Sequence, residues 1–147
     1  MKIAVGSDHA GFEDPPPHYK PELVAHLGIK GHDVIDCGTD TSKAVDYPDV
    51  AEAVAEKVLH GEADLGLLIC GTGIGMSITA NRHKGIRAAV CTTPEMARLS
   101  RQHNHANVLC LGRRVIPIEV CKEIIDAWLE ERYSEVERHV RRVEKMS

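Results

Sequence analysis

Aromatic side chains are scarce in this sequence of 147 residues, in which one Phe, one Trp and three Tyr make up 3%. Proteins that bind single-stranded nucleic acid stack bases on exposed aromatic rings, and this chain has few to offer. Positive charge is not in excess either, because 18 Lys and Arg stand against 22 Asp and Glu, for a net charge of −4. Both shortages argue against a nucleic-acid-binding surface.

Long apolar runs and paired cysteines are also missing. No segment approaches the ~20 apolar residues that span a bilayer, and the N-terminal segment lacks the apolar stretch of a signal peptide. The five cysteines include no CxxC pair, which is typical of free thiols in a reducing compartment. We therefore expect a cytoplasmic protein without a membrane partner.

The overall composition is that of an ordinary globular domain. Hydrophobic residues make up 43% and charged residues 27% of the chain, close to the averages for such domains. A chain of this length buries roughly 68–70% of its unfolded surface, which is enough for a core without cross-links. We expect residues 1–147 to form one domain.

Short apolar segments alternate with longer amphipathic ones. Strands are expected at residues 3–5, 33–35, 65–69, 88–90 and 108–111. Several of these are apolar throughout, as is typical of strands covered on both faces. The alternation predicts a single α/β domain of three layers, α/β/α, with a Rossmann-like five-stranded parallel sheet.

Helical patterns lie between and after the strands. Apolar stripes at helical spacing are formed by Val50, Val54 and Val58, by Met96, Leu99 and Ser100 after Thr93-Pro94, and by Cys121, Ile124, Ile125, Trp128 and Leu129. The prolines at 15–17 and 21 exclude a regular helix before about residue 21. Ser134 and Glu137 have the spacing of a capping box that opens a last helix.

In an open parallel sheet, ligands bind at the carboxyl ends of the strands. We place at that edge the segments 6–11, 70–77 and 112–114, which follow predicted strands. We place there as well the end of the helix after the fourth strand, which holds His103, Asn104 and His105. Acids, histidines, a thiol, glycines and arginines are thus expected on one edge.

Cys70, followed by Gly71-Thr72-Gly73-Ile74-Gly75, is the most distinctive feature. Glycines let backbone N–H groups crowd around an anion where a strand turns into a helix, and a thiol there is expected to have a lowered pKa. The alternative is a buried cysteine that ends a strand beside a plain turn. Dinucleotide- and NTP-binding loops are excluded by spacing, since Met76 occupies a required glycine position and GxxxxGK[ST] is absent.

His103 suits acid–base chemistry, because an unperturbed histidine pKa of ~6.5 is close to neutral pH. His103, His105, Asp8 and His9 lack the spacing of a metal site, so we expect no metal ion and no cofactor.

Arg138 and Arg142 stand four residues apart and could clasp a phosphate, or simply form a solvated helix face. The apolar stripe of the same helix, Val136, Val140 and Val143, must face its own domain. The arginines would then point outward, toward the substrate of a neighbouring subunit.

The chain resembles the ribose-5-phosphate isomerase B family, which also includes galactose-6-phosphate and allose-6-phosphate isomerases. The resemblance runs through nearly the whole sequence and rests on motifs in the same order: Ser7-Asp8-His9-Ala10-Gly11, Val45-Asp46-Tyr47-Pro48, residues 69–77, Ala80-Asn81-Arg82, residues 99–104 and Arg138-His139. It implies metal-free interconversion of an aldose phosphate and a ketose phosphate, such as ribose 5-phosphate and ribulose 5-phosphate. It also implies a homodimer or tetramer with shared sites.

The resemblance implies roles for individual residues as well. Cys70 would be the base that moves a proton between carbons 1 and 2 through a cis-enediolate, while His103 and Thr72 would assist ring opening and proton transfer to oxygen. The implied substrate contacts are the N–H groups of Gly71, Gly73, Ile74 and Gly75 at the oxyanion, Asp8, His9 and Asn104 at the sugar, and Arg114, Arg138 and Arg142 at the phosphate.

Two features differ from the family: the inserted Asp14-Pro15-Pro16-Pro17, and Glu137, which could compete with phosphate for Arg138. The alternatives to a ribose-5-phosphate isomerase are an isomerase of allose 6-phosphate or galactose 6-phosphate, a non-catalytic domain that binds a phosphorylated ligand, and one subunit of a hetero-oligomeric isomerase.

Overall fold

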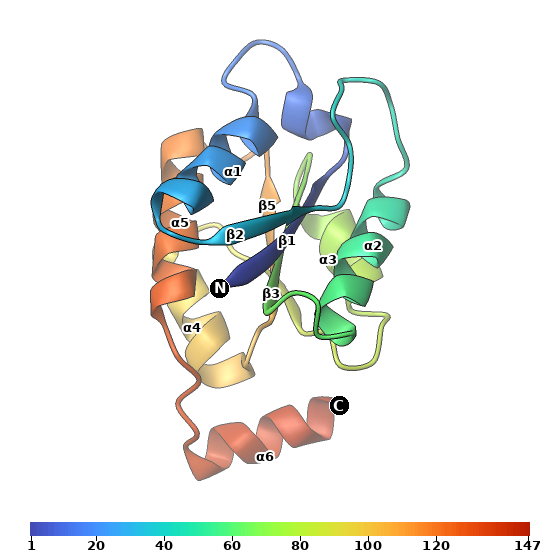
Figure 1. Ribbon diagram of the computed structural model, residues 1–147. Helices are drawn as coiled ribbons and strands as arrows, with labels where there is room; N and C mark the ends of the chain where they lie inside the picture. The colour runs from blue at the N-terminus through green and yellow to red at the C-terminus, as the bar shows by residue number, and fades with distance from the viewer.

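A parallel sheet of five strands lies at the centre of the molecule, as the computed structural model of residues 1–147 shows (Figure 1). The strands are β1 (Lys2–Ser7), β2 (Asp33–Asp36), β3 (Leu65–Cys70), β4 (Ala88–Val90) and β5 (Val108–Gly112), in the order β2-β1-β3-β5-β4. The helices are the 3-10 helix η1 (His9–Phe12), α1 (Tyr19–Ile29), α2 (Tyr47–Leu59), α3 (Ile74–Ala80), α4 (Pro94–Asn104), α5 (Ile118–Glu130) and α6 (Glu137–Met146). None of these helices is both long enough and apolar enough to cross a lipid bilayer.

Helices cover both faces of the sheet, so the predicted three-layer α/β fold is confirmed. Side chains of α1, α4 and α5 form one core with the sheet, and those of α2 and α3 form the other. Because side chains alternate along a strand, Leu67 and Ile69 of β3 enter the first core while Leu68 and Cys70 enter the second. Every residue of β3 is buried, as expected for a strand with helices on both sides.

The strands end together at one edge of the sheet, which we call the carboxyl edge. Ser7, Cys70 and Gly112 end β1, β3 and β5 there, and Cys70 is paired in register with Gly112. The loops that follow these strands rise at the top of Figure 1. We call the opposite edge, where the strands begin, the amino edge.

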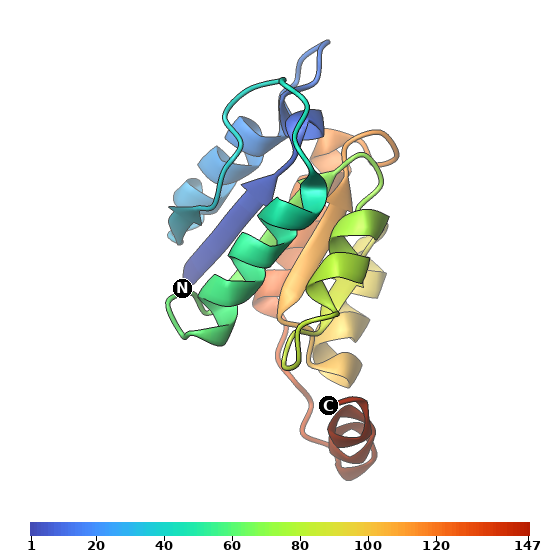
Figure 2. The same ribbon diagram turned by 90° about the vertical axis from the view of Figure 1, so that its right-hand side faces the viewer.

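Helices α4 and α6 meet at the amino edge. Thr93 caps the start of α4 at the carboxyl edge by accepting the N–H of Met96 at 3.1 Å. The far end of α4 lies where β4 begins, since Arg87 Nε donates to the carbonyl of His105 at 2.7 Å. Helix α6 contacts α4 and stands beyond this edge in Figures 1 and 2.

Two predictions for α1 and α4 were wrong in detail. Helix α1 begins at Tyr19 and includes Pro21 in its first turn. Backbone N–H groups in the first turn have no acceptor within the helix, so a proline there removes no helical hydrogen bond. The side chains that α4 buries are Ala97 and Ser100, whereas Met96 and Leu99 are 44% and 37% exposed. The small buried residues allow α4 to lie close against α5, the helix with which it makes most of its helix contacts.

The predicted capping box of α6 does not form. The helix begins at Glu137 itself, and Ser134 Oγ lies 2.6 Å from Nδ1 of His139. Both carboxylate oxygens of Glu137 accept from Arg141, at 2.9 and 3.1 Å. Glu137 is therefore not paired with Arg138, contrary to the expected competition with phosphate. The buried side chains of α6 are His139 and Val143 rather than a stripe of three valines.

Candidate active site

The sulfur of Cys70 lies at the carboxyl edge inside a tight turn. The side chain is only 5% exposed, and the N–H of Gly73 donates to Sγ at 3.1 Å. Gly73 has a φ of +85°, and a Cβ there would lie 3.2 Å from the carbonyl carbon of Leu111. Glycine is therefore required at this position for the turn to bring an N–H onto the sulfur.

The turn also presents unused backbone donors. The N–H groups of Gly73 and Ile74 are occupied, the first by Cys70 Sγ and the second by Thr72 Oγ1 at 3.2 Å. The N–H groups of Gly71, Thr72 and Gly75 have no acceptor within the chain. Of the N–H groups predicted to bind an oxyanion, those of Gly71 and Gly75 are thus available to a ligand. The N–H of Thr72 is available as well.

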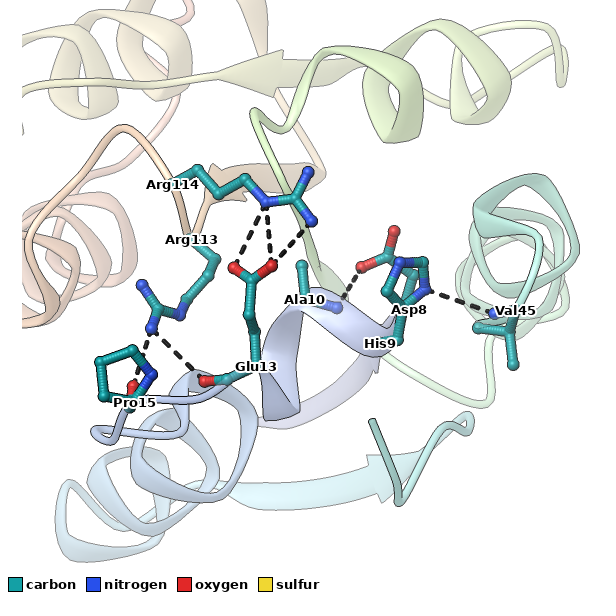
Figure 3. A network of polar contacts seen from close by, with 8 residues as sticks. All are labelled: Asp8, His9, Ala10, Glu13, Pro15, Val45, Arg113 and Arg114. Atoms are coloured by element: carbon teal, nitrogen blue, oxygen red, sulfur yellow. Dashed lines mark hydrogen bonds and ion pairs between the residues drawn. The ribbon is translucent and has the colours of Figure 1, made fainter. Parts of the chain in front are cut away.

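Asp8 and His9 follow β1 beside this turn, and both are oriented by backbone groups (Figure 3). Asp8 is 6% exposed, and its Oδ1 accepts the N–H of Ala10 at 2.9 Å, capping η1. His9 Nδ1 accepts the N–H of Val45 at 3.3 Å, which leaves the proton of the neutral ring on Nε2. An acid and an imidazole N–H are therefore fixed at the same edge of the sheet as Cys70.

Arg114 reaches the same edge from the end of β5, where it forms an ion pair that the sequence did not reveal. Its Nη2 lies 2.8 Å from Oε1 of Glu13, and its Nε lies 3.2 and 3.3 Å from the two carboxylate oxygens (Figure 3). The hydrogen bond from Arg114 lowers the pKa of the Glu13 carboxyl, and the same bond raises the pKa of Arg114.

His103, Asn104, Arg138 and Arg142 form a second group at the amino edge. The ring of His103 lies against that of His139, with centroids 4.3 Å apart and planes tilted by 33°. Burial lowers the pKa of His139, and the neighbouring His103, Arg138 and Arg142 lower it further. Neither Arg138 nor Arg142 is paired with a carboxylate, so their charges are available to an anion.

The prediction that all these groups share one edge was therefore wrong. The carboxyl edge holds Asp8, His9, Cys70, the glycine turn and Arg114, and the amino edge holds the His103 group. Helix α4 starts at the first edge and ends at the second, and eleven residues of helix are about 16 Å long. The sequence assigned no role to Glu13, which precedes the proline insertion, or to His139, although His139 belongs to the Arg138-His139 motif.

No group of three or more His, Cys, Asp or Glu side chains is arranged so that it could hold a metal ion. The donors described above are instead suited to a small, polar, anionic ligand.

Comparison with known proteins gives consistent results along the whole chain. The sequence profile of the family described as Ribose/Galactose Isomerase matches residues 3–146. Ribose-5-phosphate isomerase B of Escherichia coli (strain K12) is 53% identical over 146 residues, which are 99% of this chain and 94% of the relative. The structure of ribose-5-phosphate isomerase B of Clostridium thermocellum matches with a TM-score of 0.94 at 49% identity, covering 99% of this chain and 95% of that one. The structure of a ribose 5-phosphate isomerase of Thermotoga maritima matches with a TM-score of 0.92 at 48% identity, covering 99% of this chain and 96% of that one.

Proposed function

The chain belongs to the ribose/galactose isomerase family, and we propose that it interconverts ribose 5-phosphate and ribulose 5-phosphate as a metal-independent aldose–ketose isomerase. The observation that carries this proposal is the buried Cys70 sulfur, held by the N–H of Gly73 beside three unused N–H donors. Moving a proton next to a carbonyl requires a positioned base and donors for the oxyanion, and this turn offers both.

Cys70 acts on the open-chain sugar. Its thiolate takes the proton from C2, the electron pair of that C–H bond forms the C1–C2 double bond, and the carbonyl pair moves onto O1. A proton then passes from O2 to O1, and the thiol returns its proton to C1 while O2 becomes the carbonyl oxygen. The thiolate is restored, and no oxidant or reductant is consumed.

The unused N–H groups of Gly71, Thr72 and Gly75 stabilise the negative charge on the enediolate oxygens. Such donors act at the point where charge develops, and this is usually the largest electrostatic contribution to catalysis. Asp8 and the Nε2–H of His9 bind hydroxyl groups of the sugar, and Arg114 binds its phosphate. Thr72 and His103 assist ring opening and the transfer of the proton between oxygens.

A second chain completes the site. His103, Asn104, Arg138 and Arg142 lie at the amino edge, away from the Cys70 turn of their own chain. They reach a Cys70 turn only if the amino edge of one chain faces the carboxyl edge of another. We therefore propose a homodimer, or a tetramer built from such dimers, with His103 and the two arginines supplied by the partner. All five cysteines are free thiols, which supports a cytoplasmic location.

The test is incubation of the purified chain with ribose 5-phosphate in heavy water, followed by NMR. The proposal requires ribulose 5-phosphate to form and deuterium to enter carbon-bound positions at C1 and C2. Saturable binding without either change would instead support a non-catalytic phosphate-binding domain. Faster turnover of allose 6-phosphate or galactose 6-phosphate in the same assay would reassign the substrate, and free ribose serves as the control that lacks phosphate. Activity of the chain alone would also exclude an obligate hetero-oligomer.

A further inference from the structure

Two consecutive arginines hold the proline-rich insertion against the carboxyl edge (Figure 3). Arg113 Nη2 donates to the carbonyl oxygens of Pro15 at 2.9 Å and Glu13 at 3.4 Å. The Arg113 guanidinium also lies over the ring of Tyr19, 4.8 Å from its centroid. Arg114 binds the carboxylate of Glu13. The backbone and the carboxylate of Glu13 are thus fixed by different side chains, which gives the carboxylate a defined position.

The ion pair uses only one edge of the Arg114 guanidinium. Glu13 accepts from Nε and Nη2 and leaves Nη1 without a carboxylate partner. Nη1 lies beside Gly71, since a Cβ on that glycine would be 3.1 Å from it. The free end of the guanidinium is therefore directed at the turn that follows Cys70, while the carboxylate lies along the opposite edge of the guanidinium.

We propose that Glu13 is a positioning residue that aims Arg114 at the phosphate of the bound sugar; this rests on the proposed function. A planar guanidinium binds phosphate through a fork of two N–H groups, and the Nη1 end of Arg114 can form one while Glu13 holds the other edge. An arginine that is already oriented loses less side-chain freedom when the ligand binds. The guanidinium also stands between the carboxylate and the phosphate, which limits their repulsion.

The test compares Glu13→Gln and Glu13→Ala with Asp14→Asn. Asp14 is the next residue, is exposed and binds His18 at 2.8 Å rather than either arginine, so its variant is the matched control. We expect both Glu13 variants to raise KM for ribose 5-phosphate about fivefold, the scale of a partly exposed ion pair, with kcat unchanged. The inhibition constant of inorganic phosphate should rise by the same factor, and Asp14→Asn should match the wild type in both.

A second arm separates positioning from a general structural effect. In an Arg114→Gln background, Glu13→Gln should raise KM no further, because its effect passes through Arg114. Unchanged KM in the Glu13 variants, a fall in KM, which would mean that Glu13 competes with phosphate, or a fall in kcat alone would each overturn the proposal. Failure of the proposed function is seen separately, as a wild-type chain that does not isomerise the sugar. Calorimetric titration with inorganic phosphate still tests the role of Glu13 in that case.

Discussion

The imidazole of His103 lies on the imidazole of His139, with ring centroids 4.3 Å apart. His103 comes from α4 and His139 from α6. Ser134, on the segment that joins α5 to α6, places its Oγ 2.6 Å from Nδ1 of His139. The contact ties the exposed His103 to a buried partner whose pKa is lowered, first by burial and then by His103 and two arginines. Protonation of His139 is therefore disfavoured in the folded chain.

This relationship predicts loss of stability on the acid side. The unfolded chain protonates His139 near the ordinary value of 6.5, while the folded chain does so only at lower pH. Between these two values the unfolded state binds more protons, so the free energy of unfolding falls as pH drops below about 6.5. His139→Phe keeps a ring in place without a titrating group, and its Tm should decline less between pH 7 and pH 5.

The control for this comparison of Tm values is a histidine away from α4 and α6. His60→Gln, an exposed position after the end of α2, should follow the wild-type curve. The slope of the His139→Phe variant should not vanish, because burial and Arg87 lower the pKa of His105 as well. Identical slopes for wild type and His139→Phe would show that His139 does not contribute.

Replacing Cys70 should abolish turnover while leaving the fold intact. We expect Cys70→Ala to lower kcat about 10²–10⁴-fold, the usual contribution of a positioned general base. The variant should also unfold somewhat more easily, since the N–H of Gly73 loses its acceptor. The half-buried Cys37, which follows β2, provides the control, and Cys37→Ala should retain its activity. Substantial isomerisation by Cys70→Ala would rule out the sulfur as the base.

Mixed dimers test whether two chains share each site. Cys70→Ala and His103→Asn should each be inactive alone, but random mixing gives hybrids with one intact site and roughly a quarter of the wild-type activity. The control pairs Cys70→Ala with Thr72→Val, two changes at the same edge, and should regain nothing. If the first mixture also stays inactive after subunit exchange has been verified by mass, each site is built within one chain.

Gly73 and Gly28 should respond to alanine in opposite directions. Gly73 has a φ of +85° and backbone atoms 3.2–3.3 Å from a would-be Cβ, so Gly73→Ala should cost about 1–2 kcal/mol or more. Gly28 lies in α1 with nothing within 4 Å of its Cβ position, so Gly28→Ala should gain about 0.5–1 kcal/mol. Urea unfolding measures both, and equal effects would contradict the strain assigned to the turn.

Removal of divalent metal should leave the rate unchanged. The proposed chemistry uses a thiolate and backbone donors, and no cluster of potential metal ligands was found. Assays before and after exhaustive dialysis against EDTA decide the point. A rate that falls on dialysis and returns with added zinc would favour a metal-assisted reaction instead.

The strands were predictable because short segments that are apolar throughout indicate strands buried on both faces. Residues 65–69 are apolar throughout and become β3, which has every side chain buried. The Cys70 turn could be recognised for a similar local reason, since three glycines at alternating positions permit the positive φ and the close approach that the turn needs.

The partners of the site residues were less accessible from the sequence. Glu13 and Arg114 are 101 positions apart, and only the sheet order β1-β3-β5 brings the segments that follow β1 and β5 to the same edge. Ser134 has capping-box spacing with Glu137 but contacts His139 instead, because tertiary packing on α4 decides where α6 begins. The direction of α4 explains why His103 and Asn104 were predicted at the wrong edge. A helix that follows a strand of a parallel sheet runs back, so its last residues lie at the opposite edge.

The separation of Cys70 and His103 has a consequence for symmetry. If the carboxyl edge of one chain must meet the amino edge of another, a two-fold axis satisfies both requirements within one pair, because each chain donates and receives once. Two complete sites then form and no edge is left unmatched. A pairing without that axis would satisfy one requirement only, leave a free edge at each end, and grow by addition of further chains into a ring or a filament.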